Sequence, residues 1–315
     1  MGQDLQKISV VIPCYNEEES IPLFLDRMLE VAAGMQGAAF ELIFVDDGST
    51  DRTLKVLRLL SELHPQIKYL SFSRNFGKEA ALLAGLEAST GDFVAVIDAD
   101  LQHPPELLPQ MYAGIVEEGF DCIATRRVSR DGEPKIRSFF SRRFYRLVNK
   151  ISETEMVDGA TDYRLMTRQM VDAILSLKES NRFSKGLFSW VGFSTKWIPF
   201  QNVPRIAGNT KWSFWQLFIY SLDGIVGFSV KPLAISSFLG MMFFLVAILG
   251  SAFIAVRWLI FGDPVQGWAS TVCIILFVSG TQLFCTGILG QYIAKAYLEV
   301  KNRPIYIIKE ENKNI

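Results

Sequence analysis

The sequence predicts an α/β domain with a mainly parallel sheet, followed by a pair of membrane-spanning helices. Three observations carry this prediction: apolar runs of strand length alternate with helical stretches, the strand runs end in polar and charged residues, and two long uncharged stretches lie near the C-terminus. Alternating strands and helices are typical of a parallel sheet covered by helices on both faces. A length of 315 residues suits one domain of average to large size plus an appendage.

Strands and helices alternate in the first hundred residues. The strand runs are rich in β-branched residues and nearly continuous in apolar character, as expected when both faces of a parallel sheet are covered. We expect strands at 8–16, 40–49, 67–73 and 93–100, with helices at 20–35, 51–63 and 78–88 between them. Residues 1–210 carry charge at the density of a soluble protein and are expected to form one domain.

The polar residues of this domain gather where the predicted strands end. The four ends are Pro13–Glu18, Asp46–Asp51, Ser73–Lys78 and Asp98–His103. Three of them offer carboxylates, and the remaining one offers an arginine and a lysine. Because ligands of open α/β sheets bind at the carboxyl ends of the strands, we expect the functional site there.

Asp98 and Asp100 are separated by one residue, Ala99, after a very apolar strand. Two carboxylates so close repel each other unless a positive group lies between them. Mg²⁺ or Mn²⁺ takes one or two carboxylates together with phosphate oxygens, which makes this pair a candidate metal site. His103 is interpreted as a structural residue or a neighbour of the ligands, and His64 as a surface residue.

Asp46 and Asp47 leave two interpretations open. The segment FVDDGSTD would form a capped turn without any ligand. A nucleoside contact is the alternative, favoured by the neighbouring loop that contains Asn16.

The two uncharged stretches predict a membrane hairpin. Pro232–Val256 has 25 residues and Pro264–Ala294 has 31 without Asp, Glu, Lys or Arg, whereas about 20 helical residues cross the hydrocarbon core. We expect spans at about 232–257 and 267–294 within 230–296. A buried helical hairpin in a soluble protein is disfavoured because core helices of this length usually show a polar face.

Basic residues set the orientation of the hairpin. Lys211 and Lys231 precede it, and Arg257 stands alone in the link. Basic residues also follow it, among them Lys295, Lys301, Arg303 and Lys309. The positive-inside rule therefore places residues 1–210 and the tail at 297–315 in the cytoplasm, and the polar N-terminus shows no signal peptide. Small residues in the second span suit helix packing, and we expect a homo-oligomer.

Two further segments are expected at the membrane surface. Apolar residues fall on one face of the segment at about 135–151, and cations occupy the rest, which is typical of an interfacial helix; a helix packed on the sheet is the alternative. The segment at 211–229 is also expected to be interfacial. A net charge of −1 argues against a nucleic-acid partner, and the four dispersed cysteines suggest neither zinc nor disulfides.

Four motifs in order, IPCYNEEESI, FVDDGSTDRTL, SRNFGKEAALLAGL and IDADLQHPPEL, resemble family-2 glycosyltransferases with the Rossmann-like GT-A fold. The chain is most similar to the polyprenyl-phosphate glycosyltransferases of the dolichol-phosphate-mannose-synthase type, and its two-helix tail resembles the bactoprenol glucosyltransferases of O-antigen modification. The resemblance implies an inverting transfer of a sugar from a nucleotide-diphosphate sugar to polyprenyl phosphate. It also implies an integral protein of the bacterial inner membrane with a cytoplasmic GT-A catalytic domain.

The resemblance also implies roles for single residues. Those expected at the donor are Pro13, Tyr15, Asn16, Glu17, Asp46, Asp47, Lys78, Asp98, Ala99, Asp100, Arg205 and Lys211. The metal ligands are expected to be Asp98, Asp100 and Gln102. Arg205 and Lys211 match an R-x-x-G-x-(S/T)-K element, with Thr where Ser is usual.

Asp158 and Asp162 are the candidate catalytic carboxylates, and Asp158 is favoured because the family has an Asp six residues before an Arg, here Arg164. A phosphate monoester is already largely ionised at neutral pH, so positioning of the acceptor is as plausible a role as proton removal. The residues expected at the acceptor phosphate are Arg126, Arg127, Arg137 and Ser141.

UDP-glucose and undecaprenyl phosphate are the favoured substrates, while GDP-mannose or UDP-GlcNAc would use the same motifs. A processive polysaccharide synthase is disfavoured because the sequence has no Q-x-x-R-W motif and too few spans. An inactive membrane scaffold with a GT-A domain stays an alternative.

Overall fold

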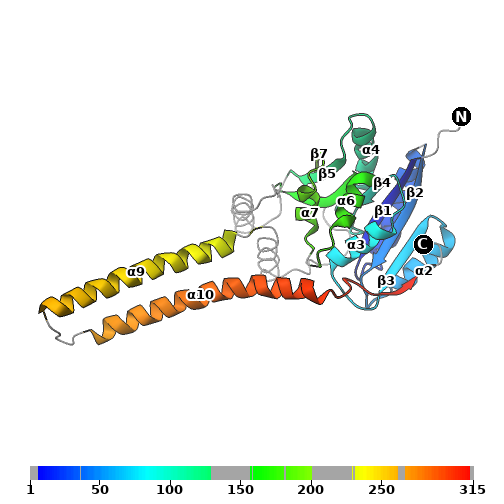
Figure 1. The fold of residues 1–315 in the computed structure, drawn as a ribbon. Helices are drawn as coiled ribbons and strands as arrows, with labels where there is room; N and C mark the ends of the chain where they lie inside the picture. The colour runs from blue at the N-terminus through cyan, green and yellow to red at the C-terminus, as the bar shows by residue number, and fades with distance from the viewer. Residues whose placement is uncertain are drawn as a thin grey trace.

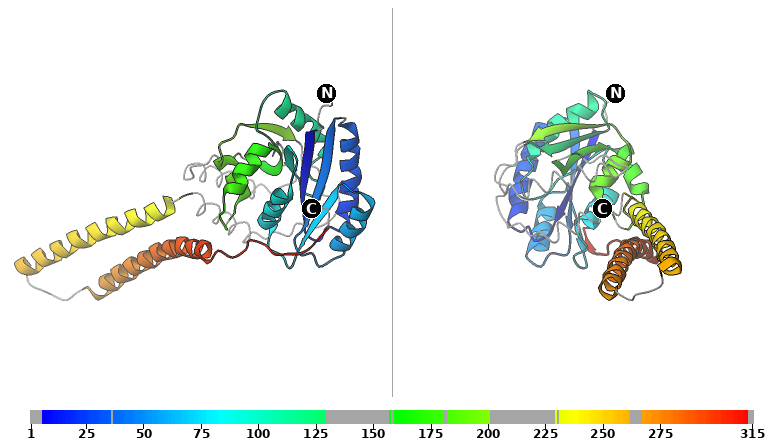
Figure 2. Two further views of the ribbon diagram at one scale, coloured as in Figure 1. Left: turned by 45° about the vertical axis from the view of Figure 1, so that its right-hand side comes forward. Right: turned by 90° about the vertical axis from the view of Figure 1, so that its left-hand side faces the viewer.

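The chain forms an α/β body from which two long helices extend side by side (Figures 1 and 2). The structure is a computed structural model, and it describes residues 6–35, 37–128, 157, 159–180, 182–200, 229, 231–261 and 267–312. The predicted alternation is confirmed in the first part of the body. Its elements are β1 (Gln6–Cys14), α1 (Ser20–Gly34), β2 (Ala38–Asp46), α2 (Thr53–Leu63), β3 (Ile67–Phe72), α3 (Lys78–Ala88) and β4 (Phe93–Val96).

The α/β body also contains elements after β4 that the sequence patterns did not predict. They are the short 3₁₀ helix η1 (Pro105–Leu107), α4 (Leu108–Val116), β5 (Cys122–Arg127), β6 (Ala160–Thr167), α6 (Arg168–Ser176), α7 (Ser184–Trp190), β7 (Thr195–Phe200) and β8 (Ile308–Glu311). In the described residues the strands form one sheet in the order β7-β5-β6-β4-β1-β2-β3-β8.

The sheet is mixed, with a parallel centre. The strands β4, β1, β2 and β3 pair in parallel, as do β5 and β7. The strand β6 is antiparallel to both β4 and β5, and β8 is antiparallel to β3. Because β1 to β4 run the same way, the loops that follow them meet at one edge of the sheet, where the sequence places the functional site.

Helices cover both faces of the sheet, as the apolar character of the strands predicts. Neighbouring residues of β1 point to opposite faces: Val10 packs with the cluster that includes α1 and α4, and Val11 with the cluster that includes α3, α6 and α7. Both side chains are at most 1% exposed. The central strand therefore has a core on each side and holds the loop after it firmly.

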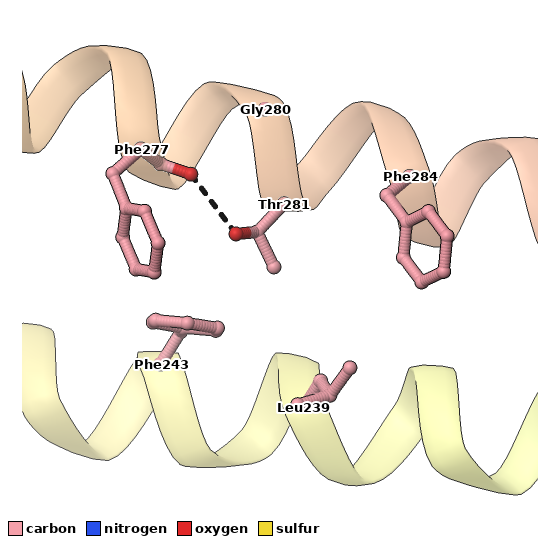
Figure 3. A pocket seen from close by; sticks show the side chains of 6 residues that line it. All are labelled: Leu239, Phe243, Phe277, Gly280, Thr281 and Phe284. Carbon is pink, nitrogen blue, oxygen red and sulfur yellow. Dashed lines mark hydrogen bonds between the residues drawn. The ribbon is translucent and has the colours of Figure 1, made fainter.

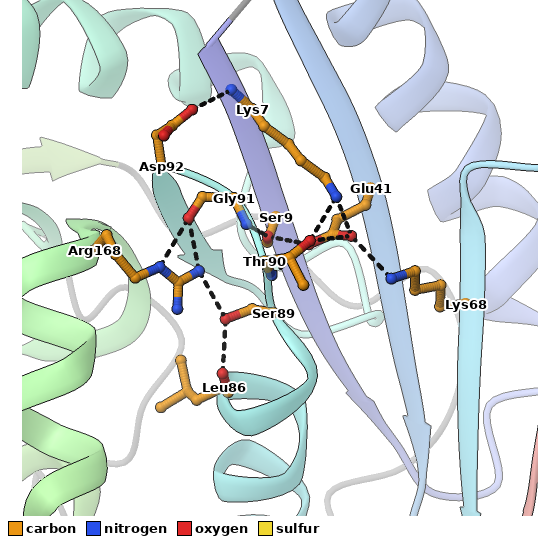
Figure 4. Close-up of polar contacts among 10 residues, drawn as sticks. All are labelled: Lys7, Ser9, Glu41, Lys68, Leu86, Ser89, Thr90, Gly91, Asp92 and Arg168. Carbon is orange, nitrogen blue, oxygen red and sulfur yellow. Dashed lines mark hydrogen bonds and ion pairs between the residues drawn. The ribbon is translucent and has the colours of Figure 1, made fainter. Parts of the chain in front are cut away.

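A closed polar cluster lies at the amino end of the parallel strands (Figure 4). Glu41 is 3% exposed, and its carboxylate is 2.7 Å from the Lys7 ammonium and 3.2 Å from that of Lys68. Its carboxylate also accepts hydrogen bonds from Ser9 Oγ and from the Thr90 amide (2.7 Å). Burial raises the pKa of Glu41, but the hydrogen bonds from Lys7, Ser9 and Thr90 outweigh burial and lower the pKa from 4.5 to about 2.

The C-terminal segment returns to the α/β body. The strand β8 lies along β3, and Arg58 binds the Glu310 carboxylate through Nε (2.7 Å) and Nη2 (2.5 Å). The ring of Tyr306 stacks on Phe72 with centroids 4.9 Å apart. The predicted cytoplasmic tail thus forms an edge strand of the sheet, which no pattern in its sequence indicates.

The two long helices are α9 (Lys231–Phe261) and α10 (Trp268–Lys301), which cover the segments at 232–257 and 267–294. Phe243 and Phe277 meet edge to face between them, with centroids 5.4 Å apart. An open apolar groove runs along this seam (Figure 3). It is lined by Leu239, Phe243, Phe277, Gly280, Thr281 and Phe284.

The apolar surface of these helices is largely exposed. Within the described residues, one stretch, Lys231–Gly250, has the length and hydropathy of a membrane span, with a mean hydropathy of 2.3 and 6% of its residues buried. The predicted second span is present as a helix, α10. The expected interfacial segments at 135–151 and 211–228 lie outside the described residues.

Candidate functional site

The loops after β1 and β2 bind each other. The Asn16 amide donates to Ser49 Oγ (2.9 Å), and the Thr50 amide donates back to Asn16 Oδ1 (2.8 Å). The Glu17 amide donates to Thr53 Oγ1 (2.9 Å) at the start of α2. The structure thereby places the predicted donor residues after β1 beside those after β2. Pro13 and Tyr15, also predicted at the donor, are half-buried in the same stretch.

Asp46 and Asp47, at the end of β2, bind the loop that follows β2 and the end of β3 with its following loop. Asp46 accepts hydrogen bonds from the Ser49 amide (3.0 Å) and from Ser71 Oγ (2.7 Å). Asp47 accepts from the amides of Phe76 (2.6 Å) and Gly77 (2.9 Å). Both carboxylates are buried. The bond from the Ser49 amide closes the predicted turn, but the N-cap residue of α2, Arg52, makes no side-chain capping bond. Burial raises the pKa of Asp47, and the hydrogen bonds from the backbone amides of Phe76 and Gly77 oppose that effect. The nucleoside contact stays a prediction.

Gly48 allows the loops after β2 and β3 to approach closely. Its φ is +65°, and a Cβ at this position would lie 2.3 Å from the carbonyl carbon of Arg74. Only glycine fits both the backbone conformation and the contact. The close approach brings the start of α3, and with it Lys78, to the carboxyl edge of β1 and β2.

Lys78, Asp98 and Asp162 form one cluster of charges, called here the Lys78 cluster. The Lys78 ammonium is 2.6 Å from Asp98 Oδ1 and 2.6 Å from Asp162 Oδ2. The three side chains come from the start of α3, the loop after β4 and the strand β6, and are 39%, 25% and 17% exposed. The cluster thus joins a predicted donor residue, a predicted metal ligand and a predicted catalytic residue.

The charges of this cluster stabilise one another. Burial disfavours the ammonium, but the carboxylates of Asp162 and Asp98 outweigh burial and raise the pKa of Lys78. Burial likewise opposes ionisation of Asp162, but Lys78 and Lys185 hold its pKa well below the usual range. Lys78 and Asp162 are therefore charged at neutral pH, and Asp162 is a poor proton acceptor.

Asp100 is the second carboxylate of the predicted metal site. Its Oδ1 accepts a hydrogen bond from the Gln102 amide (3.1 Å), and the intervening Leu101 has a φ of +56°. The turn keeps Asp98, Asp100 and the half-buried Gln102 at one end of β4. Ala99, predicted at the donor, is buried beneath this turn.

His103 follows this turn and is 3% exposed. Its ring lies between Tyr163 and Phe200, with centroids 6.0 and 5.5 Å away. Its Nδ1 is 4.0 Å from Asp98 Oδ2, and neither ring nitrogen has a hydrogen-bond partner in the described part of the chain. Burial lowers the pKa of His103, which favours the neutral imidazole.

The donor set fits a hard divalent cation. Asp98 and Asp100 supply carboxylate oxygens, and Mg²⁺ typically takes one or two protein carboxylates with phosphate oxygens and water. Within the described ranges, no three His, Cys, Asp or Glu side chains are close enough to hold a metal by themselves. A cation here would therefore need oxygens from a ligand, from water or from Gln102.

Arg126 and Arg127 end β5, where they were predicted to meet the acceptor phosphate. Arg126 is exposed, while Nε of Arg127 is buried and has no partner among the described residues. The Arg127 amide donates to the Gly159 carbonyl (2.9 Å), so the residue next to Asp158 lies against the end of β5. The other predicted site residues lie outside the described residues: Asp158, Arg137, Ser141, Arg205 and Lys211.

Two further cations lie near the cluster, and neither was predicted as a site residue. Arg164 is buried on the ring of Phe188, 3.7 Å from its centroid, and donates to the Thr161 carbonyl (3.0 Å). Lys185 enters from α7 and donates to the Ala160 carbonyl (3.4 Å). Lys185 lies far along the chain from every motif, so only the folded structure shows that it belongs to the site.

Residues 9–175 match the profile of glycosyl transferase family 2. The chain is 43% identical to the candidate glycosyltransferase CsbB of Bacillus subtilis over 305 aligned residues. The alignment covers 97% of this chain and 92% of that protein. It is 39% identical over 307 residues to the bactoprenol glucosyl transferase of Shigella phage SfII, covering 98% of this chain and 99% of that protein. Among solved structures it resembles the mannosyltransferase PcManGT from Pyrobaculum calidifontis in complex with GDP-Man and Mn²⁺, with 18% identity, a TM-score of 0.48 and coverage of 93% and 86%.

Proposed function

The chain belongs to glycosyl transferase family 2, and from this premise we propose that it transfers a sugar from a nucleotide-diphosphate sugar to polyprenyl phosphate, with inversion, at the cytoplasmic face of a bacterial membrane. The observation that carries the proposal is the Lys78 cluster at the carboxyl ends of the parallel strands. Glucose from UDP-glucose is the proposed sugar, and undecaprenyl phosphate the proposed acceptor. The 39% identity to a bactoprenol glucosyl transferase supports both choices.

The donor half of the site lies at the ends of β1, β2 and β4. We assign the nucleoside to the loop at Tyr15–Glu17 and to Asp47, and the divalent cation to Asp98 and Asp100 with Gln102. Mg²⁺ or Mn²⁺ held there would neutralise the charge that develops on the departing diphosphate. Lys78 contacts Asp98, which supports its assignment to the same diphosphate.

Lys78 gives the site a cation of its own. Its ammonium already neutralises Asp98 and Asp162 at 2.6 Å. Together with Arg205 and Lys211, whose assignment rests on the sequence motif, it would bind the diphosphate oxygens. Positive groups fixed where negative charge develops stabilise the transition state most, because they need no rearrangement during the reaction.

On the acceptor side, Asp158 is proposed as the catalytic carboxylate. The low pKa of Asp162 and its contact with Lys78 suit a positioning role better than proton removal. Because the acceptor phosphate is largely ionised at neutral pH, Asp158 is assigned to orienting the acceptor or the sugar hydroxyls. The acceptor phosphate is assigned to Arg126, Arg127, Arg137 and Ser141.

The helices α9 and α10 are proposed to anchor the enzyme as a transmembrane hairpin. Their apolar side chains are mostly exposed, and the stretch Lys231–Gly250 has the hydropathy of a span. The basic segment at 135–151 and the segment at 211–229 are proposed to lie in the membrane interface and to bring the lipid phosphate to the donor. Assembly into a homo-oligomer belongs to the same proposal.

Transfer to lipid is measured directly. Membranes containing the full chain are incubated with undecaprenyl phosphate and labelled UDP-glucose, GDP-mannose or UDP-GlcNAc, with and without Mg²⁺. A chloroform-soluble labelled product that requires the cation supports the proposal, and the donor that yields it identifies the sugar. The Asp98→Asn variant is expected to lose the product, while Asp172→Asn, a 64% exposed carboxylate on α6, is the matched control that keeps it.

Product from GDP-mannose or UDP-GlcNAc alone would change the donor and leave the acceptor assignment intact. The absence of product from every donor, with the wild-type chain folded in the membrane, would favour a scaffold without transferase activity.

A further inference from the structure

His103 is held rigidly beside a proposed metal ligand. Tyr163 and Phe200 flank its ring, with centroids 6.0 and 5.5 Å away, and two prolines follow it in the sequence. The Tyr163 hydroxyl also donates to the Pro105 carbonyl (3.3 Å), two residues after His103. The imidazole is therefore confined by its neighbours to one place next to Asp98.

Within the part of the chain that the structure describes, the two ring nitrogens of this imidazole lack the hydrogen-bond partners that a buried polar group normally has. The residue is 3% exposed, yet in the described residues neither ring nitrogen has a hydrogen-bond partner. Buried polar atoms in native proteins nearly always have one, and an exception calls for a partner or a role. The nearest carboxylate oxygen that can accept is Asp98 Oδ2, 4.0 Å from Nδ1.

The distance to Asp98 is too long for a hydrogen bond, and Lys78 accounts for it. Lys78 Nζ is 2.6 and 2.9 Å from the two oxygens of Asp98 and so binds both. If Lys78 turned toward the oxygens of a bound diphosphate and one oxygen of Asp98 held a cation, the other oxygen of Asp98 would be free to accept a hydrogen bond. A small rotation of the Asp98 carboxylate then closes the gap to Nδ1.

We propose that His103 is a positioning residue for the metal site: its Nδ1–H donates to the second oxygen of Asp98 and fixes that carboxylate for cation binding. This inference rests on the proposed metal site. Carboxylates that bind metals are usually hydrogen-bonded by a second layer of side chains, and the loss of such a partner typically lowers metal affinity about 10- to 100-fold. In this arrangement one oxygen of Asp98 would hold the cation, and the other would accept the hydrogen bond from His103.

A packing role for the ring predicts the opposite result for two substitutions. The Nδ2 of asparagine lies where Nδ1 of histidine lies, because both follow Cγ, whereas phenylalanine keeps the ring and has no donor. His103→Asn therefore keeps the proposed hydrogen bond and loses the packing. His103→Phe keeps the packing and loses the hydrogen bond.

The test measures Mn²⁺ binding to the full chain in detergent. The electron paramagnetic resonance signal of free Mn²⁺ reports how much of the ion remains unbound. We expect His103→Phe to weaken Mn²⁺ binding by about 10-fold or more and His103→Asn to stay within about 3-fold of wild type. His64→Phe, at the chain's other histidine, is the matched control and is expected to bind as wild type. Melting temperatures show that each variant is folded.

If His103→Phe does not fold, His103→Gln replaces it. The amide nitrogen of glutamine corresponds to Nε2 of histidine and not to Nδ1. His103→Gln is therefore expected to lose Mn²⁺ affinity, while His103→Asn retains it. Unchanged Mn²⁺ affinity in His103→Phe, or an equal loss in His103→Asn, would overturn the inference. Asp98→Asn separates the two levels of the proposal. If it binds Mn²⁺ as wild type does, the metal site itself is wrong; if only Asp98→Asn loses Mn²⁺, the role of His103 alone is wrong.

Discussion

The two ends of the parallel strands carry similar groups in different states. At the amino end, Glu41 is 3% exposed and binds Lys7, Lys68, Ser9 and Thr90 (Figure 4). At the carboxyl end, the Lys78 cluster is 17–39% exposed, and the buried His103 beside it lacks a partner in the described residues. A polar cluster that is closed stabilises the fold, whereas one that is open to solvent and incompletely bonded has capacity for a ligand.

The largest expected effect is on stability at the amino end. Removing one partner of a buried ion pair costs about 3 kcal/mol at the lower end of the usual range, and Glu41→Gln should destabilise the chain by about that amount. Denaturant titration of the full chain in detergent measures it. Sugar transfer per folded molecule should not change, and a specific loss of transfer would place function at this end as well.

The pH dependence of the free energy of unfolding should show the contribution of Glu41 at the amino end. The pKa of Glu41 is about 2 in the folded chain against 4.5 as its ordinary value. Because the folded pKa is lowered, the stabilisation is fully present above pH 4.5 and is lost as the pH falls toward 2, about 3 kcal/mol in all. Unfolding of wild type and Glu41→Gln is compared between pH 6 and roughly 2.5. Equal slopes for both chains would mean that another group is responsible.

At the carboxyl end the expected effect is on activity. Asp98→Asn removes a proposed metal ligand, and transfer to lipid should fall at least about 100-fold, equivalent to about 2.7 kcal/mol in the barrier. Its melting temperature should move by less than about 4 °C, because the lost ion pair with Lys78 is partly exposed. A variant that unfolds instead would show that this cluster, too, is mainly structural.

Lys78→Gln tests whether the lysine and the cation share Asp98. Without the ammonium, Mn²⁺ alone should bind about 5-fold more tightly, since partly exposed ion pairs contribute up to about 1 kcal/mol. Binding of the nucleotide-diphosphate sugar should weaken in the same variant. Both are measured by titration, with Lys196→Gln, a lysine paired with Glu118, as the control. Weaker binding of Mn²⁺ would show that Lys78 supports the cation site and does not compete with it.

The smallest effect is expected at the sheet edge that β8 covers. Arg58 and Glu310 are 49% and 30% exposed, so Glu310→Gln should cost less than about 1 kcal/mol. Transfer activity should match wild type. A larger loss of activity than of stability would indicate that the C-terminal strand also influences the site, through Tyr306 and Phe72.

The sequence alone determined the local elements and the position of the site. The strands and helices from β1 to β4 follow from apolar runs and helical spacing, which neighbouring residues encode directly. The motifs at the strand ends also identified the family and selected Lys78 and Asp98, and the resemblance to that family added Asp162 as a candidate catalytic carboxylate. The resemblance to family-2 glycosyltransferases is confirmed by the match over residues 9–175.

Only the tertiary structure decided which of these residues meet. Lys78 and Asp162 are 84 positions apart, and their contact depends on the antiparallel insertion of β6 beside β4. The burial of His103 between Tyr163 and Phe200, and the pairing of β8 with β3, likewise depend on packing between distant segments. Local periodicity specifies strands and helices, whereas the choice of neighbouring strands follows from the packing of the whole core, which no short stretch of sequence contains.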